Sequence, residues 1–331
     1  MYRSLLAFAV LVTVGLIMLG AYVRLSDAGL GCPDWPGCYG RLSPDAASAP
    51  IARAVAEQGG EHGPVSMGKA WREMLHRYVA TSLGILSLLI AFFAVRDRIR
   101  LKQAPTLALV LAAVVVLQGL FGMWTVTLKL KPAIVTGHLF GGLLTLGLLV
   151  WLWQRQINLP RYLDAEPVAA LRAPLAIGLA LVCLQVLLGG WTSANYAALA
   201  CSDFPTCQGQ WWPPMNFGDA FQLLRDLGKT GQGQALPAAA LTAIHVAHRI
   251  GALVVAGYLL WLARALLRTG GVVALGVLLL AVLFVQLALG ISNVLFSLPL
   301  PVAVAHTGMA AILVALMVVL NFRASRARLQ I

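Results

Sequence analysis

The sequence is poor in charge. Only 11% of its 331 residues are Asp, Glu, Lys or Arg, against roughly a quarter in soluble domains. Acids are scarcest, with 12 Asp and Glu against 24 Lys and Arg, so the formal net charge is +12. This composition excludes a cytosolic enzyme and a disordered chain. It also excludes a nucleic-acid partner, because DNA-binding domains gather basic residues on one soluble face, whereas here they lie in short runs between apolar stretches.

Long apolar stretches make up most of the sequence. Hydrophobic residues make up 60% of the chain, and its mean hydropathy is +0.84. Eight stretches could cross about 30 Å of hydrocarbon as helices of about 20 residues, and they lack the two-residue alternation of strands. The sequence therefore predicts an all-α polytopic membrane protein whose first span is retained, not cleaved as a signal peptide. The predicted spans are residues 4–23, 76–95, 104–125, 133–153, 173–192, 240–262, 271–292 and 301–322.

The distribution of Lys and Arg predicts how these spans are oriented. Basic residues follow the second, fourth and sixth spans and fill the C-terminal tail, on the same side as Arg3. Cytoplasmic connections carry an excess of Lys and Arg, so this side is predicted to be cytoplasmic and to hold both termini. Two long loops, 24–75 and 193–239, lie on the outer side. The basic residues of the inner side include Arg96, Arg98, Arg100, Lys102, Arg155, Arg161, Arg172, Arg264, Arg268, Arg323, Arg326 and Arg328.

The two halves of the sequence contain the same motifs in the same order. The two outer loops share a C-x5-C spacing with Asp and Pro in matching places. We therefore expect two pseudo-symmetric four-helix bundles, residues 1–155 and 156–331, related by an axis along the membrane normal. The repeated motifs are Cys32-Pro-Asp-Trp-Pro-Gly-Cys38 and Cys201-Ser-Asp-Phe-Pro-Thr-Cys207 in the loops, and Gln118-x3-Gly122 and Gln286-x3-Gly290 in the third and seventh spans.

Each half also has one histidine in its second span and one in its fourth, near the outer ends. They are His76 and His138, then His248 and His306. Such residues are costly in hydrocarbon and are functional candidates. Four separately hydrogen-bonded core histidines are one interpretation; we favour two metal centres, each held by two imidazoles from facing helices. Two histidines without carboxylate or thiolate partners do not complete a zinc tetrahedron, but they supply both axial positions of a haem iron.

Charged residues flank these histidines. Arg77 and Arg249 each follow a histidine directly and are predicted to bind haem propionates; ordinary interfacial arginines are the alternative. Small residues near the histidines could let a macrocycle approach the backbone, although they also serve plain helix packing. These residues are Gly141, Gly142, Gly189, Gly190 and Gly290.

Glu73 breaks the repeat. It precedes His76 by about one turn, where the second half has His245 before His248. A carboxylate there could handle protons during an oxidation, or it could complement the helix dipole. We expect His248 to be the ligand and His245 to support the cofactor site beside it. His62, in a Gly-rich loop segment, is expected to be solvated.

Four of the five cysteines are paired by their spacing in the outer loops. On an oxidising side such pairs form disulfides, here Cys32–Cys38 and Cys201–Cys207, which could brace the loops or exchange electrons with an external thiol system. Zinc bound by all four thiolates is an alternative, although neither pair has the short C-x2-C spacing of zinc knuckles. Cys183, in the fifth span, is predicted to be a buried apolar residue.

Three segments resemble a known family. The sequence closely resembles the haem A synthase family over almost its whole length, and the Cys-Pro-Asp-Trp-Pro segment beside an intramembrane Glu-x-x-His-Arg is specific to it. The residues that carry the resemblance are GAYVRLSDAGLGCPDWPGC at 20–38, Glu73-x-x-His76-Arg77 and Gly137-His138.

The resemblance implies an oxidoreductase of the bacterial plasma (inner) membrane. Such an enzyme oxidises the C8 methyl group of haem O to a formyl group and so makes haem A for terminal oxidases. The second half would hold a permanent haem b through His248 and His306. The first half would receive the substrate haem at His76 and His138, with Glu73 essential nearby, so these three are the candidate catalytic residues.

Other functions and several partners stay open at this stage. A two-haem b membrane electron carrier and a non-catalytic haem transporter or chaperone are the alternatives. Expected partners are haem O synthase, an electron-transfer partner and further copies of the chain as a homo-oligomer. The resemblance also implies a role in activity for Cys32–Cys38. The loop 43–68 has no assigned role.

Overall fold

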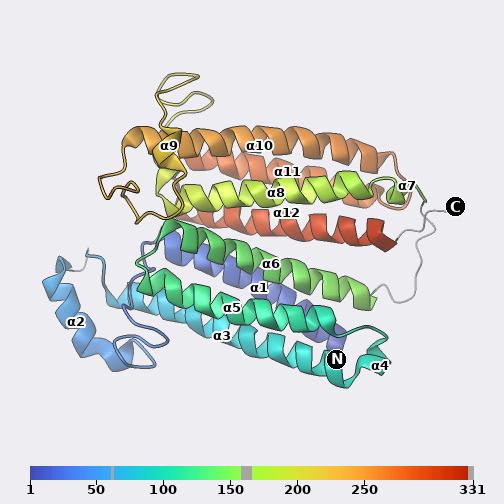
Figure 1. The fold of residues 1–331 in the computed structure, drawn as a ribbon, viewed down its shortest axis with the longest axis horizontal. Coiled ribbons are helices and arrows are strands. Elements are labelled where there is room, and N and C mark those ends of the chain that lie inside the picture. The colour runs from blue at the N-terminus through green and yellow to red at the C-terminus, as the bar shows by residue number, and fades with distance from the viewer. Residues whose placement is uncertain (61–62, 158–165, 327–331) are drawn as a thin grey trace.

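The computed structural model describes residues 1–60, 63–157 and 166–326, and this part of the chain is helical without strands. Eight of its helices are long and apolar enough to cross a membrane, and they lie alongside one another (Figure 1). The predicted all-α polytopic fold is confirmed. The eight helices are α1 (Tyr2–Leu25), α3 (Met67–Arg96), α5 (Thr106–Thr127), α6 (Pro132–Ile157), α8 (Arg172–Ala194), α10 (Ala238–Leu267), α11 (Val273–Leu295) and α12 (Leu300–Arg326).

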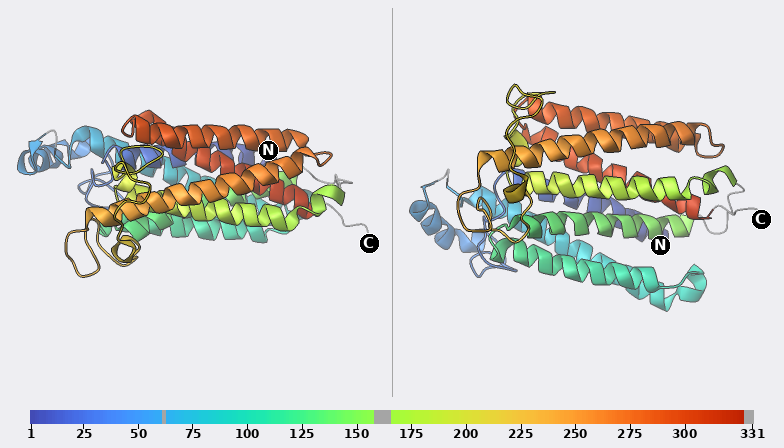
Figure 2. Two further views of the ribbon diagram at one scale, coloured as in Figure 1. Left: turned by 90° about the horizontal axis from the view of Figure 1, so that it is seen from above. Right: turned by 45° about the horizontal axis from the view of Figure 1, so that its top comes forward.

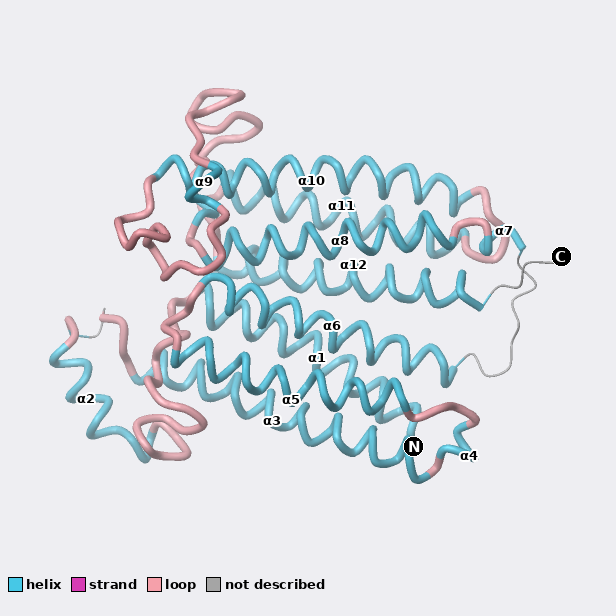
Figure 3. The backbone as a smooth tube through the Cα atoms, viewed as in Figure 1, coloured by secondary structure: helices cyan, strands magenta, loops and turns pink. Residues whose placement is uncertain are grey.

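Short helices occur in the connections between them. They are η1 (Asp45–Ala47), α2 (Ser48–Glu57), α4 (Arg98–Leu101), α7 (Glu166–Ala169), η3 (Ala197–Leu199) and α9 (Phe217–Ala220). Helix α2 projects beyond the ends of the long helices (Figure 3). Its buried residues Ile51 and Ala54 belong to a small apolar cluster with the first disulfide and Met74. Three residues named above, His62, Arg161 and Arg328, lie outside the described residues.

Helix α3 begins nine residues before the predicted span at 76. Its first two turns are polar, so hydropathy does not reveal them, but Ser66 caps the helix by accepting a hydrogen bond from the Lys69 N–H at 3.3 Å. At about 1.5 Å per residue its 30 residues exceed the hydrocarbon thickness. Glu73 and His76 therefore lie well inside a helix, not at its mouth.

The long helices form two rings of contacts. Helix α1 packs against α3 and α6, and α5 packs against the same two helices. In the second half α8 packs against α10 and α12, and α11 packs against those two. The halves meet where α12 contacts α1 and α6 and where α6 contacts α8 (Figure 2). The largest apolar core crosses this boundary, because Ile17 and Leu146 of the first half share it with Leu175, Leu259 and Met317 of the second.

Both loops that carry disulfides lie at one end of the bundle, and the start of α1 and the end of α12 lie at the other (Figure 1). At the disulfide end Arg24 joins the two halves. Its Nη2 donates to the Ser193 carbonyl at 2.7 Å, and its guanidinium lies 3.8 Å from the centre of the Tyr196 ring. The Tyr196 hydroxyl in turn donates to Asp27 at 2.8 Å.

We predict that Arg24→Ala destabilises the full chain by about 1–3 kcal/mol, because it removes a charged donor from a partly buried carbonyl. Arg100→Ala is the matched control, since the Arg100–Asp97 pair is exposed and such pairs contribute about 0–1 kcal/mol. Thermal unfolding of both variants in detergent measures the difference. Equal melting temperatures for the two variants would contradict this role of Arg24.

Candidate metal centres and their covering loops

The two histidines of the first half face each other across the bundle. The ring centres of His76, on α3, and His138, on α6, are 6.4 Å apart, and the ring planes are inclined by 81°. Metal–imidazole bonds of about 2 Å place two rings on opposite sides of one ion with their centres roughly 6 Å apart. The Nδ1 atoms of both rings are buried and have no hydrogen-bond partner among the described residues. The pair therefore fits bis-imidazole ligation of a haem iron.

The second pair, His248 on α10 and His306 on α12, differs in its surroundings. The Gln185 amide nitrogen lies 3.0 Å from His248 Nδ1 and also donates to the His248 carbonyl at 2.9 Å. The Gln286 amide nitrogen lies 3.4 Å from His306 Nε2. Amide side chains thus contact both rings of the second half, whereas neither ring of the first half has such a contact in the described part of the chain.

A glycine on a neighbouring helix lies against each of the four histidine rings. A Cβ atom added at any of these glycines would lie within 3.5 Å of the imidazole Cε1 and would push the ring or the helix away. These close approaches explain the glycine of the Gln-x3-Gly motifs, because a side chain there would collide with a ring. The glutamine lies one turn away on the same face of the helix. The distance from the added Cβ to Cε1 of the ring is 3.0 Å for Gly20 and His76, 3.5 Å for Gly122 and His138, 3.1 Å for Gly189 and His248, and 3.1 Å for Gly290 and His306.

Glu73 and His245 occupy the same place in the two halves. A Glu73 carboxylate oxygen accepts a hydrogen bond from the Cys32 N–H at 2.9 Å, and His245 Nδ1 accepts one from the Cys201 N–H at 3.3 Å. Both side chains are only 4% exposed. The first turn of α3 contains no acid, so Glu73 does not act as a complement to the helix dipole. Glu73 and His245 thus both accept a hydrogen bond from the first cysteine of their loop, Glu73 through a carboxylate and His245 through an imidazole.

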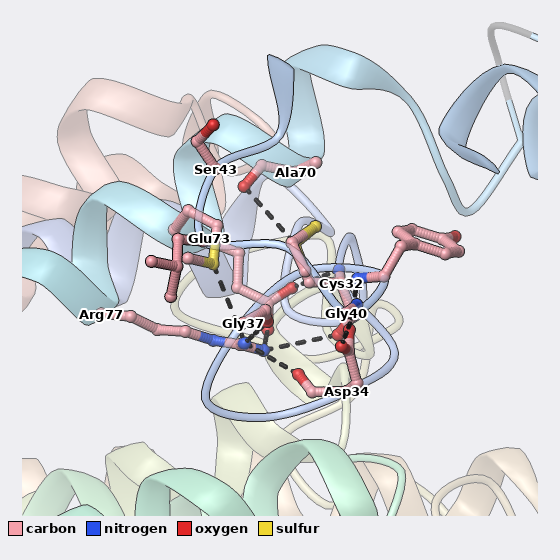
Figure 4. Close-up of a disulfide and its surroundings, with 12 residues drawn as sticks. Cys32, Asp34, Gly37, Gly40, Ser43, Ala70, Glu73 and Arg77 are labelled. Carbon is pink, nitrogen blue, oxygen red and sulfur yellow. Dashed lines mark hydrogen bonds and ion pairs between the residues drawn. A yellow bond between two sulfur atoms is a disulfide. The ribbon is translucent and has the colours of Figure 1, made fainter. Parts of the chain in front are cut away.

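Arg77 and Arg249 hold the disulfide loops. Arg77 forms an ion pair with Glu73, and its Nη1 donates to the carbonyls of Asp34, at 2.8 Å, and Gly37 (Figure 4). Arg249 donates to the carbonyls of Thr206, at 2.7 Å, and Asp203, at 2.8 Å. The sequence did not predict these contacts. The binding of haem propionates by the two arginines stays a prediction.

The cysteine pairs are disulfides, as predicted, and the zinc alternative is wrong. Cys32–Cys38 and Cys201–Cys207 are bonded, and the described residues hold no group of three or more His, Cys, Asp or Glu arranged for a metal ion. Cys183 is a free thiol, but it is only partly buried, so the prediction of a buried residue is wrong.

An aspartate folds each disulfide loop in the same way. Asp34 accepts hydrogen bonds from the N–H groups of Tyr39 and Gly40. In the second loop the Thr206 hydroxyl and two backbone N–H groups donate to Asp203, and these contacts hold the pKa of Asp203 below its usual value. The turn needs a residue with positive φ, and Gly40 has a φ of +72° there.

The fold and these sites define a multi-pass helical membrane protein with two internal pairs of facing-helix histidines under disulfide-bonded loops. The chain belongs to the cytochrome oxidase assembly protein family, whose model matches residues 3–318. A haem A synthase of Shewanella oneidensis is 42% identical over 96% of this chain and 95% of its own length. This confirms the resemblance predicted from the sequence.

More distant relatives also match over most of their length. The haem A synthase of Halalkalibacterium halodurans is 26% identical over 95% of this chain and 94% of the relative. That of Granulibacter bethesdensis is 28% identical over 93% of this chain and 82% of the relative.

Two supporting residues escaped the sequence analysis, Gly20 and Gln185. The signal for Gln185 was present, because Gln185-x3-Gly189 is a third copy of the motif in the third and seventh spans. Gly20 has no glutamine one turn before it, because Leu16 occupies that place. Only the contact with His76 identifies it.

We predict that Arg249→Ala exposes the Cys201–Cys207 disulfide to reductant. Both sulfurs are buried, so reduction requires the loop to open, and hydrogen bonds to a charged group contribute about 1.5–3 kcal/mol each. The rate of reduction should rise about tenfold or more, measured by thiol labelling and peptide mass analysis. Arg264→Ala, on the exposed opposite end of α10, is the control. An unchanged rate in Arg249→Ala would show that the arginine does not hold the loop.

Proposed function

We propose that this protein is a haem A synthase that oxidises the C8 methyl group of haem O to a formyl group, producing haem A for terminal oxidases. The observation that carries the proposal is the facing pair His76 and His138, with ring centres 6.4 Å apart, in a family whose relatives are named haem A synthase. Haem O is the substrate, and His76 and His138 bind it.

The second pair, His248 and His306, holds a resident haem b. The amide groups of Gln185 and Gln286 support a different role for this site, because they contact both of its rings, whereas the described residues give neither ring of the first half such a contact. When bound, haem b provides a one-electron redox centre beside the substrate site. The helices that carry His138 and His306, α6 and α12, are in direct contact, which supports two neighbouring sites.

Glu73 supports placing the reaction in the first half. Conversion of a methyl to a formyl group removes four electrons and releases protons, so the substrate site needs a proton acceptor. Glu73 lies on α3 about one turn before His76, and its carboxylate is held by the Cys32 N–H and by Arg77. The second half has His245 in this place. A carboxylate at this position therefore occurs in the first half and not in the second.

The arrangement of the helices supports two pseudo-symmetric units, 1–155 and 156–331. The contacts of α1, α3, α5 and α6 in the first half have counterparts in those of α8, α10, α11 and α12 in the second. We place the protein in the bacterial inner membrane with both termini in the cytoplasm. The disulfides favour an oxidising periplasmic side for the loops, and the basic residues lie at the opposite end.

A two-haem b electron carrier is the second candidate function, and the two matched histidine pairs favour it. The difference between Glu73 and His245 favours the synthase, because a carrier needs no carboxylate at only one of its two sites.

We predict that Glu73→Ala abolishes haem A formation and leaves the haem b spectrum intact, since Glu73 belongs to the first site alone. His306→Met should instead disturb the haem b spectrum. Purified protein is measured by absorption, and extracted pigments are identified by mass. Glu57→Ala, at the exposed end of α2, is the control. Full activity of Glu73→Ala would refute its role, and two haem b per wild-type chain with no haem O, haem A or hydroxylated intermediate would favour the electron carrier.

We predict that a membrane-impermeant maleimide labels Arg53→Cys in intact cells and does not label Arg100→Cys. Both arginines are exposed, but Arg53 lies on α2 in the first disulfide-bearing loop and Arg100 lies at the opposite end of the bundle. After the membrane is permeabilised, both variants should react. Labelling of Arg100→Cys alone in intact cells would reverse the orientation.

A further inference from the structure

Arg72 lies on the same face of α3 as His76, one turn nearer the end of the bundle that carries the disulfide loops. Residues four apart in a helix share a face, and their side chains lean toward the helix N-terminus. The Arg72 guanidinium lies 5.6 Å from the centre of the Tyr22 ring on α1. Tyr22 comes two residues after Gly20, the glycine that lies against the His76 ring. Arg72 therefore lies between α3 and α1, on the outer side of the first histidine pair.

The guanidinium of Arg72 is unoccupied. Within the described part of the chain it forms no hydrogen bond and no ion pair, and its contact is with the Tyr22 ring. Arg77 differs, because its donors are taken by the ion pair with Glu73 and by loop carbonyls. A guanidinium that lies over an aromatic ring keeps its N–H edge available for a planar acceptor such as a carboxylate. Of the two arginines beside His76, Arg72 is thus the one with donors available for a ligand.

The second half has no cation at this position of α10. Matching His76 with His248 pairs Arg72 with Ile244. Ile244 is 1% exposed and packs in an apolar cluster with Trp191. The turn on the outer side of the histidine is therefore charged in the first half and apolar in the second.

A guanidinium nevertheless lies over the matching aromatic ring of the second half, and a different segment supplies it. Trp191 comes two residues after Gly189, as Tyr22 does after Gly20, and the Arg225 guanidinium lies 5.6 Å from the centre of its ring. Arg225 is 2% exposed and donates to the Asn195 side-chain oxygen at 2.5 Å. Among the described residues it has no ion pair, and its Nε has no partner. A buried charge without a counter-charge is costly, and an anion beside it would remove this cost.

We infer that Arg72 binds a propionate carboxylate of the substrate haem. This inference rests on the proposed function. A haem carries two propionates on one edge, and burying a carboxylate is costly unless a cation pairs with it. Arg72 provides that cation on the outer side of the His76–His138 pair, with its donors unoccupied.

The pairing also orients the macrocycle. Two imidazoles on one axis leave a haem free to rotate about that axis. A carboxylate held by a guanidinium through two parallel hydrogen bonds fixes this rotation. The same methyl group then has the same surroundings at each turnover.

The two guanidinium groups are held differently, in agreement with the two proposed roles. Arg72 is only partly buried, and no hydrogen bond ties it to the described part of the covering loop. Arg225 is buried in its loop and hydrogen-bonded there. A substrate must enter and leave at each turnover, whereas a resident haem stays, so the accessible arginine belongs at the substrate site.

The test compares a haem that has free carboxylates with one that lacks them. Full-length protein in detergent, with haem b in the His248–His306 site, is titrated with iron protoporphyrin IX, with its dimethyl ester and with haem O. Absorption follows binding to the first site. Arg72→Met should lower the affinity for the diacid and for haem O about tenfold, because a charge-assisted hydrogen bond is lost, and should leave the affinity for the ester unchanged. Arg53→Met, which removes an exposed arginine of α2 on the same side, is the matched control and should bind all three as the wild type does.

Two results would overturn the inference. Equal losses for the diacid and the ester in Arg72→Met would show that the arginine only supports the packing of α3 against Tyr22. Unchanged affinity for the diacid would show that the propionates bind elsewhere. If Arg72→Met does not fold, as judged by loss of the second-site spectrum, Arg72→Gln is read by the same ratio of diacid to ester affinity. The proposed function fails separately, if wild-type protein binds haem O but never converts it to haem A.

Discussion

Two imidazole rings, those of His76 and His138, face each other inside the apolar bundle, and the rest of the structure depends on this constraint. A buried ring nitrogen without a partner is unfavourable, and three of the four rings keep such an Nδ1 atom. These unpartnered nitrogens support the proposed haem sites. The glycines opposite the rings follow from the same constraint, because any larger residue would press on an imidazole that must stay free to face its partner.

The outer loops are locked to the same helices that carry the histidines of α3 and α10. In each half the residue after the histidine, Arg77 or Arg249, donates to loop carbonyls, and the residue one turn before it accepts the N–H of the first cysteine. Each loop is thus bound to the helix turn that carries the histidine. In the first half the loop contacts the carboxylate of Glu73 directly, so it forms part of the surroundings of the site.

Sequence patterns predicted the spans, the disulfides and the histidine positions, because each of these has a strong local signal. They missed the start of α3, because its first turns are polar and the signal there is a single Ser66 cap. They also missed the role of Arg77 and Arg249, because the acceptors are backbone carbonyls, which no sequence pattern marks. Gly20 was missed for a similar reason. Glycines are common in membrane helices, and only the structure shows that Gly20 lies against the ring of His76 on another helix.

The differences between the two halves are not spread evenly around the rings. On the walls formed by α5 with α6 and by α11 with α12, the same residue types recur, with Gln118 and Gly122 matching Gln286 and Gly290, and among the described residues only the amide of Gln286 contacts its histidine ring. On the walls formed by α1 with α3 and by α8 with α10, two positions differ in kind: Leu16 against Gln185, and Glu73 against His245. The wall with the shared residues carries His138 in the first half and His306 in the second. The other wall carries the differences: a carboxylate and a leucine in the first half, and an imidazole and an amide in the second. Under the proposed function, a repeated scaffold holds two similar groups and treats only one of them as a substrate, because the carboxylate that would handle protons lies on the wall that differs between the halves.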